Sequence, residues 1–254
     1  MFIKKLLLLL LPTIFIYTLS LDLTSSSVAK SNSVTKRPPP PRRIPPNKVK
    51  PGGGLDLYYS SCNEANESLV ALIPVENPVL TTKAYPSFLF YVPDAPSQIS
   101  HGEFSILSAD EKERIYQTSI DFESTPGIIK IDLPSDSQYS IQEDRIYHWY
   151  LKVYCKNFQE TNKTLDVDGW IKRVSLTRDL ESKIATGSPD IWYDAIALTA
   201  EDLTTSPQNL TVRDRWSKLL RHINREHLTN VTLPMQTFKN ETVRIDYIPK
   251  FPVK

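Results

Sequence analysis

Aromatic and basic side chains alternate along one β-prone segment, residues 146–156. Because successive side chains of a strand point to opposite faces, His148, Tyr150 and Tyr154 are expected to share one face of it. Trp170 belongs to the next β-prone segment, where the sequence leaves its face open. Rings arranged in this way can stack sugars, peptides or polymers. We therefore take these four residues as the candidate ligand-binding or partner-binding surface.

The motifs of common catalytic and nucleotide-binding sites are missing from the sequence. Phosphate-binding loops need clustered glycines, and the glycines after residue 54 are all isolated. The patterns Gly-x-Ser-x-Gly and His-Glu-x-x-His do not occur. His222 and His227 are five residues apart, or about 140° around a helix, so they do not share a ligand face. The sequence thus assigns no catalytic residue, no metal ligand and no cofactor.

Acidic residues supply two further candidate sites, one for calcium and one for glycosidic chemistry, and both have simpler explanations. The run Asp166–Gly169 resembles the start of a calcium loop, but Thr177 stands where such a loop needs its bidentate glutamate. We therefore expect an acidic turn there. Glu111 and Glu113 lie two residues apart and are expected to be solvated, since glycosidic chemistry needs two carboxylates across a cleft.

The elements that must position these residues are mostly strands. Turn residues, chiefly Pro, Gly, Asn and Asp, separate short apolar segments. Seven segments have strand character: Ser68–Ile73, Ser87–Val92, Glu103–Leu107, Arg114–Phe122, Ile128–Leu133, Ile146–Lys156 and Gly169–Leu176. Short strands at this spacing predict a mainly β fold, an antiparallel β-sandwich of immunoglobulin or fibronectin type.

The sixth of these segments has the clearest core face. Its apolar positions follow the period of two that a half-buried strand requires. They are Tyr147, Trp149, Leu151, Val153 and Cys155. The stretch that leads into this segment, residues 133–147, resembles a corner of such sandwiches at which a tyrosine hydroxyl bonds back to the backbone.

The C-terminal third changes to helical periodicity. One helix is expected after Pro189, and a second over about residues 210–224, with Ser206-Pro207 between them. This α-hairpin must pack on the sandwich. Its Trp192 and Tyr193 could cover the aromatic strand face, which is the alternative to an exposed binding surface. A last β-prone run, residues 242–248, is expected to form an edge strand.

The first 54 residues do not resemble a folded domain. Residues 1–29 are expected to be a signal peptide, because two lysines precede a short apolar run and a Ser-Val-Ala cleavage site. An uncleaved membrane anchor is the alternative. The protein is accordingly expected in the periplasm, the cell envelope or the extracellular medium. Residues 30–54 form a Pro-rich basic linker, and residues 55–254 form the domain.

Charge is distributed unevenly along the chain. Residues 22–54 hold seven basic residues and one acid, whereas residues 55–254 hold 21 basic residues and 28 acids. An acidic domain behind a basic leader does not suggest nucleic-acid binding by the fold. The basic leader suits an anionic polymer or a lipid surface.

The chain has two cysteines, Cys62 and Cys155. In an exported protein an even number of cysteines favours a disulfide. Such a bridge would close a loop of about 94 residues and contribute about 4–5 kcal/mol in the chain-entropy model. Two unpaired buried thiols are the alternative.

Three strings make the chain similar to a known family. They are Tyr147–Tyr150 followed by Cys155, Gly169–Val174 and Ile191–Ala195. Together with the upstream Cys62, they resemble the secreted cyanobacterial family catalogued as domain of unknown function 928. The resemblance covers nearly all of residues 55–230. It implies an exported bacterial protein with a sandwich fold, and it supplies no activity and no catalytic residues.

Three hypotheses follow for the function. The first is a non-enzymatic binding or adaptor module that holds another envelope or secreted protein. The second is a carbohydrate-binding module for cell-surface polysaccharide, which requires His148, Tyr150, Tyr154 and Trp170 to be accessible together. The third is a hydrolase whose site no motif reveals. None of them involves nucleic acid, and a membrane enters only through an uncleaved N-terminal segment.

Overall fold

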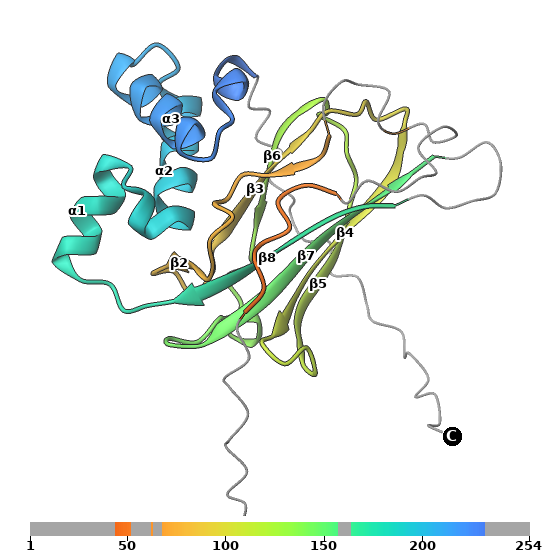
Figure 1. Cartoon of the computed structure of the whole chain (residues 1–254), viewed down its shortest axis with the longest axis horizontal. Coiled ribbons are helices and arrows are strands. Elements are labelled where there is room, and N and C mark those ends of the chain that lie inside the picture. Colours follow the sequence, from red (N-terminus) through yellow and green to blue (C-terminus); the bar gives the residue numbers. More distant parts are fainter. Residues whose placement is uncertain (1–43, 52–61, 63–67, 157–163, 232–254) are drawn as a thin grey trace, which may run out of the picture. The chain divides into compact units, whose positions relative to one another are not determined.

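The computed structural model describes residues 44–51, 62, 68–156 and 164–231 (Figure 1). The expected signal peptide, the linker up to residue 43 and the expected edge strand at 242–248 lie outside these residues. No helix within the described residues is long and apolar enough to cross a membrane.

The chain is mainly β, and its strands form two sheets. The five-stranded sheet has the order β2 (Val79–Thr81), β8 (Thr164–Arg173), β7 (Ile146–Cys155), β4 (Ile99–Ser108) and β5 (Arg114–Ile120). The three-stranded sheet has the order β1 (Val70–Ala71), β3 (Ser87–Val92) and β6 (Gly127–Asp132). All seven expected strands are present, although their ends differ. The immunoglobulin-like assignment stays a prediction.

One strand departs from the expected antiparallel arrangement. β2 was not predicted, and it pairs with β8 in parallel. It has three residues and follows the Asn77-Pro78 turn, so it is too short for a period of two to stand out. The carboxylate of Asp194 holds this strand by accepting from the Thr81 hydroxyl (2.5 Å) and from the Thr82 N–H (2.8 Å).

The two sheets bury their aromatic faces against each other. Tyr147, Trp149, Leu151, Val153 and Cys155 of β7 are all buried, which confirms the predicted core face. The Trp149 ring contacts Phe88, Phe90 and Phe104 at centroid distances of 5.4–6.3 Å. Gly169 lies opposite Trp149 in the register of β7 and β8, and a Cβ there would come within 2.5 Å of the indole.

The Tyr147 hydroxyl accepts a hydrogen bond from the backbone N–H of Gln142 at 2.9 Å. The donor lies five residues upstream, between a short 3₁₀ helix, η2 (Ser137–Tyr139), and the start of β7. The stretch before β7 therefore contains the tyrosine-to-backbone bond that its sequence predicted.

The described part of the C-terminal region, up to residue 231, has three α-helices, one more than the expected hairpin. They are α1 (Arg178–Thr186), α2 (Trp192–Thr205) and α3 (Leu210–His222), with 3₁₀ helices η3 (Pro189–Ile191) and η4 (Glu226–Asn230). The additional helix, α1, begins at the cap residue Thr177 and ends at Gly187 with φ 74°. It buries none of its residues, and its apolar stripe is short, with Leu180 and Ile184 one turn apart.

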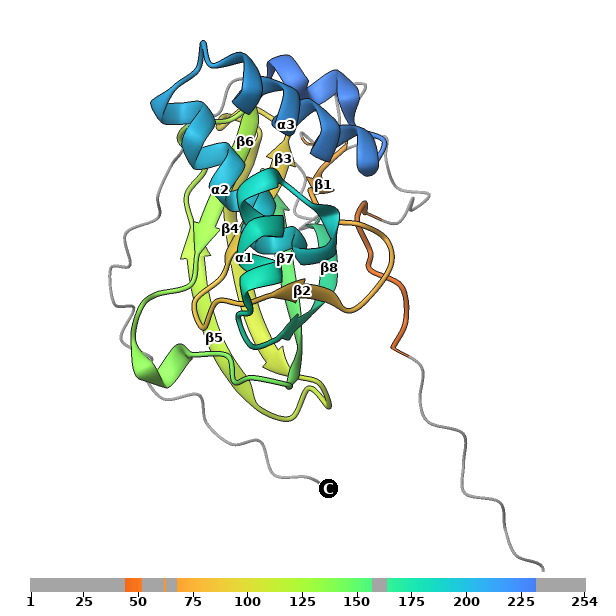
Figure 2. The same ribbon diagram turned by 90° about the vertical axis from the view of Figure 1, so that its left-hand side faces the viewer.

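The helices gather on one side of the sheets (Figures 1 and 2). α2 packs on β2 and β3, and α1 and α3 pack on α2. The Trp192 indole donates to the Leu72 carbonyl at 2.7 Å, and the Tyr193 hydroxyl accepts from the Trp149 indole at 2.6 Å. Both rings belong to the core, Tyr193 beside Phe88 and Trp149, and Trp192 beside His222 of α3. The expectation that they cover the opposite face of β7 is wrong.

Cys62 and Cys155 form the predicted disulfide, with 5.5 Å between their Cα atoms. The bridge attaches residue 62 to the C-terminal end of β7, 93 positions along the chain.

Residues 47–49, which we call the strap, were expected to belong to the linker but lie against both sheets. Lys48 exchanges two backbone hydrogen bonds with Asp168 of β8, and the Val49 carbonyl accepts from the Ala71 N–H of β1. The Asn47 amide donates to two carbonyls of residues 74–76, and its oxygen accepts from the Trp170 N–H at 2.8 Å. Prolines flank residues 47–49 on both sides, so the sequence did not show that this short segment pairs with the sheets.

Candidate functional site

The candidate site lies on the face of the five-stranded sheet opposite the core. His148 of β7 and Trp170 of β8 are register partners, so both side chains project from this face. Their rings stack, with centroids 3.8 Å apart and planes 11° from parallel. Each residue is less than 8 % exposed. The position of Trp170, which the sequence left open, is thereby settled.

The His148 imidazole is held between two carboxylates. Its Nδ1 lies 2.7 Å from Glu111 Oε1, and its Nε2 lies 2.9 Å from Asp168 Oδ1. An ionised carboxylate only accepts hydrogen bonds, so each of these two contacts is made with a ring nitrogen that can donate to it. The imidazole is thereby fixed between Glu111 and Asp168.

Glu111 reaches His148 from the turn between β4 and β5. Its φ of 59° lies in the left-handed region, which is uncommon for residues other than glycine and is costly. Backbone hydrogen bonds of Ser108 with Glu111 and Glu113 close the turn. The hydrogen bonds from His148, and then from Tyr150, lower the pKa of Glu111 below its usual 4.5.

Tyr150 completes this network. Its hydroxyl donates to Glu111 Oε1 at 2.9 Å and lies 2.8 Å from His148 Nδ1. Burial, and then the adjacent Glu111 carboxylate, raise the pKa of the Tyr150 phenol, so it stays protonated and remains a donor. We call His148, Tyr150, Trp170, Glu111 and Asp168 the histidine cluster.

Tyr154 lies apart from the histidine cluster. It stacks on His101 of β4, with centroids 4.3 Å apart and planes 7° from parallel. Tyr154 lies four positions after Tyr150 on β7, which is roughly 13 Å along an extended strand. The structure thus brings three of the four predicted site residues together and leaves Tyr154 at the other end of the face.

Charged side chains occupy the face between these two aromatic groups. In the register of the sheet, Lys152 lies between Glu103 of β4 and Asp166 of β8. Asp166 also forms an ion pair with Lys48 of the strap. The face therefore alternates cationic and anionic groups and has no single dominant sign.

Two members of the histidine cluster were missed in the sequence. Glu111 was expected to be a solvated carboxylate, and Asp168 was assigned to an acidic turn. Asp168 instead lies within β8, where it is the register partner of Tyr150. The run Asp166–Gly169 alternates acidic residues with Val167, which is a strand pattern as much as a turn pattern. That alternation was the available signal.

Hydrogen bonds and ring stacking hold the histidine cluster in place. Within the described residues, no group of three or more His, Cys, Asp or Glu side chains is placed to hold a metal ion. Both ring nitrogens of His148 lie within hydrogen-bond distance of a carboxylate of the protein itself. The surface of the cluster that a ligand or partner could contact carries Tyr150, Glu111 and the neighbouring charged side chains.

The comparisons with known proteins give a family and no activity. No curated protein and no solved structure matches the chain. Residues 50–233 match the model of a family described as Domain of Unknown Function (DUF928), which is more than half of the chain. The matched range includes both sheets, the disulfide and the histidine cluster. The chain therefore belongs to the DUF928 family.

Proposed function

We propose that this protein is a non-enzymatic binding module of the cell envelope or exterior, and that it holds a protein partner on the face that carries the histidine cluster. The observation that supports this most is the saturation of His148 by Glu111, Asp168 and the Trp170 ring. A histidine that acts as an acid or base must exchange a proton with a ligand. Here both nitrogens are committed to the protein.

The composition of the face favours a protein over a small ligand. Lys152 is exposed and lies between Glu103 and Asp166, while the half-buried Tyr150 and Tyr154 stand on either side. Interfaces between proteins combine aromatic anchors with a charged rim. Complementary charges would align such a partner and speed its association.

An extracytoplasmic location agrees with the disulfide and the N-terminal sequence. Disulfides persist in oxidising compartments and are rare in the cytosol. The Lys-Lys start, the apolar run and the Ser-Val-Ala string suit an export signal. In this proposal the basic Pro-rich segment before the strap tethers the domain near an anionic envelope polymer.

The test is capture from native envelope extract on the immobilised chain from Lys30 onward, produced in an oxidising compartment. We expect one stoichiometric protein partner. Its capture should be lost with Lys152→Glu and with Tyr150→Ala, and retained with Lys218→Glu, which makes the same charge change on the exposed surface of α3. Equal capture by all three variants, or no retained protein, would refute the proposal.

Carbohydrate binding is the second candidate, and the His101–Tyr154 stack favours it because one ring system remains partly exposed. His148 and Trp170 cannot stack a sugar while they cover each other. The carbohydrate hypothesis therefore rests on Tyr150 and Tyr154 alone. Glycan retained by the same column without any protein, and lost with Tyr154→Ala, would favour this function instead.

A further inference from the structure

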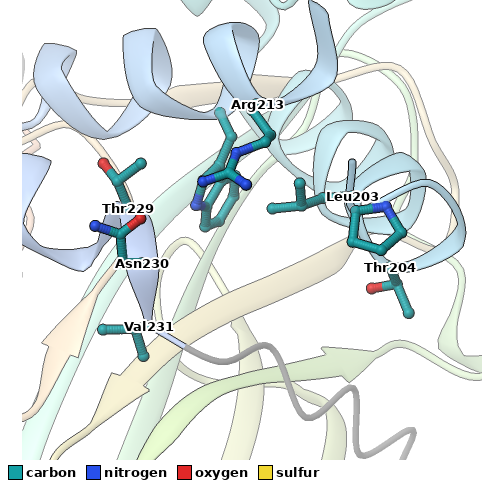
Figure 3. A pocket seen from close by; sticks show the side chains of 8 residues that line it. Leu203, Thr204, Arg213, Thr229, Asn230 and Val231 are labelled. Atoms are coloured by element: carbon teal, nitrogen blue, oxygen red, sulfur yellow. The ribbon is translucent and has the colours of Figure 1, made fainter. Parts of the chain in front are cut away.

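A cavity of about 340 Å³ lies among the end of α2, α3 and η4, away from the histidine cluster. In Figure 3, Arg213 lies between Leu203 and Thr204 on one side and Thr229, Asn230 and Val231 on the other. The residues that matter here are Leu203, Pro207, Arg213, Trp216, Asn230 and Val231. The volume is at the lower end of ligand sites and suits about two amino-acid residues.

The charge of the cavity comes from a single side chain. Arg213 is exposed, and it forms no ion pair with any described residue. The nearby carboxylate of Asp202 is taken by Arg215, at 3.1 Å. No acidic residue is among the described residues that line the cavity. The guanidinium is therefore available for an anion, and its planar fork suits a carboxylate.

Trp216 adds a second donor without an acceptor. The residue is 1 % exposed, and its Nε1 atom has no hydrogen-bond partner among the described residues. Trp149 and Trp192 donate to Tyr193 and to the Leu72 carbonyl, whereas the buried Nε1 of Trp170 likewise has no partner among the described residues. A buried N–H without an acceptor costs free energy, and such groups are rare. A ligand oxygen deep in the cavity would supply this acceptor. The exposed Arg213 side chain would turn inward to contact the same ligand.

We propose that this cavity binds the C-terminal carboxylate of a peptide whose last residue is apolar. Arg213 and the Trp216 N–H donate to the carboxylate. The exposed Asn230 amide, with one donor group and one acceptor, is complementary to the preceding peptide group. Leu203, Pro207 and Val231 enclose the apolar side chain. This site is independent of the proposed partner face, which lies on the five-stranded sheet.

Calorimetry on the full chain tests the proposal with N-acetyl-leucyl-leucine as the probe. Its C-terminal amide is the matched ligand, which lacks only the charge. We expect saturable binding of the acid, and at least about tenfold weaker binding of the amide, because a charge-assisted pair is lost. Octanoate separates the peptide from a simple fatty carboxylate. Octanoate binding as tight as the peptide would overturn the peptide assignment.

Two variants locate the site. Arg213→Gln should weaken peptide binding at least about tenfold, whereas Arg221→Gln, at an exposed position on the same helix, should leave it unchanged. Asn230→Ala should weaken binding of the peptide but not of octanoate. Unchanged binding in Arg213→Gln would overturn the proposal.

Nuclear magnetic resonance provides a readout that does not depend on affinity. The chain has four tryptophans, and Trp216→Phe assigns one indole N–H resonance. That resonance should shift downfield when the peptide saturates the wild-type protein, while the Trp149 and Trp192 resonances stay in place. An unmoved Trp216 resonance at saturation would also overturn the proposal. If Trp216→Phe fails to fold, the wild-type titration and Arg213→Gln still decide the question.

Discussion

The two faces of β7 hold their aromatic residues by different physical means. On the inner face, Trp149 packs among phenylalanines and donates to the buried Tyr193 hydroxyl. On the outer face, His148 stacks on Trp170 and forms bonds to two carboxylates. The inner face depends on apolar burial, and the outer face depends on charge. Because its side chains alternate, β7 stabilises the core with one face and supplies the polar groups of the surface with the other.

The two faces should also differ in how well they tolerate substitutions. Closely packed cores respond to the loss or gain of a single methylene group, because the neighbouring atoms relax only partly. Charged networks that water can reach are screened by salt and contribute less. We therefore expect large, salt-independent effects from substitutions on the inner face, and smaller, pH-dependent and salt-dependent effects on the outer face.

Trp149→Ala should have the largest effect. It removes a fully buried indole and leaves the Tyr193 hydroxyl without its donor, so the free energy of unfolding should fall by about 3–5 kcal/mol. Urea denaturation with salt concentration as a second variable measures this. A loss below about 1 kcal/mol would remove the distinction between the two faces.

Gly169→Ala tests the same packing from the opposite strand. The added Cβ would come within 2.5 Å of the Trp149 ring and 2.7 Å of Ile73. Overpacking of this kind should cost about 1–3 kcal/mol, again without salt dependence. Denaturation of Gly169→Ala in the Trp149→Phe background is the control, because a smaller ring should relieve part of the clash.

His148→Ala tests the outer face. It leaves Glu111 and Asp168 without the imidazole that both contact and uncovers the Trp170 ring, so we expect a loss of about 1–2 kcal/mol. The loss should shrink as salt rises, because Glu111 is 47 % exposed. A loss that does not respond to salt would mean that ring stacking, rather than charge, holds this cluster.

The smallest expected effect concerns acid stability. The pKa of Glu111 is lower in the folded protein than its usual 4.5, so its ionised form stabilises the fold above that pH. This contribution should be lost as the pH falls through the lower, folded-state pKa. Glu111→Gln should therefore flatten the acid side of the stability curve measured between about pH 6 and pH 3. Glu113→Gln, on the same turn, is the matched control.

The sequence predicted those parts of the fold that a local pattern encodes. The period of two along residues 146–156 gave the buried face of β7, and the pair Cys62 and Cys155 gave the disulfide. The helix α1 was missed because it is short and its apolar stripe, Leu180 and Ile184, is not fully buried. Its cap residues, Thr177 and Gly187, were a second local signal.

Three of the five residues of the histidine cluster were predicted from the sequence, and Glu111 and Asp168 were not. His148 and Tyr150 share a strand, so their common face follows from alternation. Glu111 lies 37 residues before His148, on a turn whose left-handed φ no sequence pattern announced. Its position depends on the register of β4 with β7, which is a tertiary property.

The strap sets a limit on where this domain can be cut. The match to the family begins at residue 50, three positions after Asn47. A chain begun there would lack the partners of the Asp168 and Trp170 N–H groups, and β8 would present part of an open edge. Open edges are templates for pairing with other chains. A recombinant domain trimmed to the family boundary should therefore aggregate more readily than one that begins before Asn47, although only a few residues separate them.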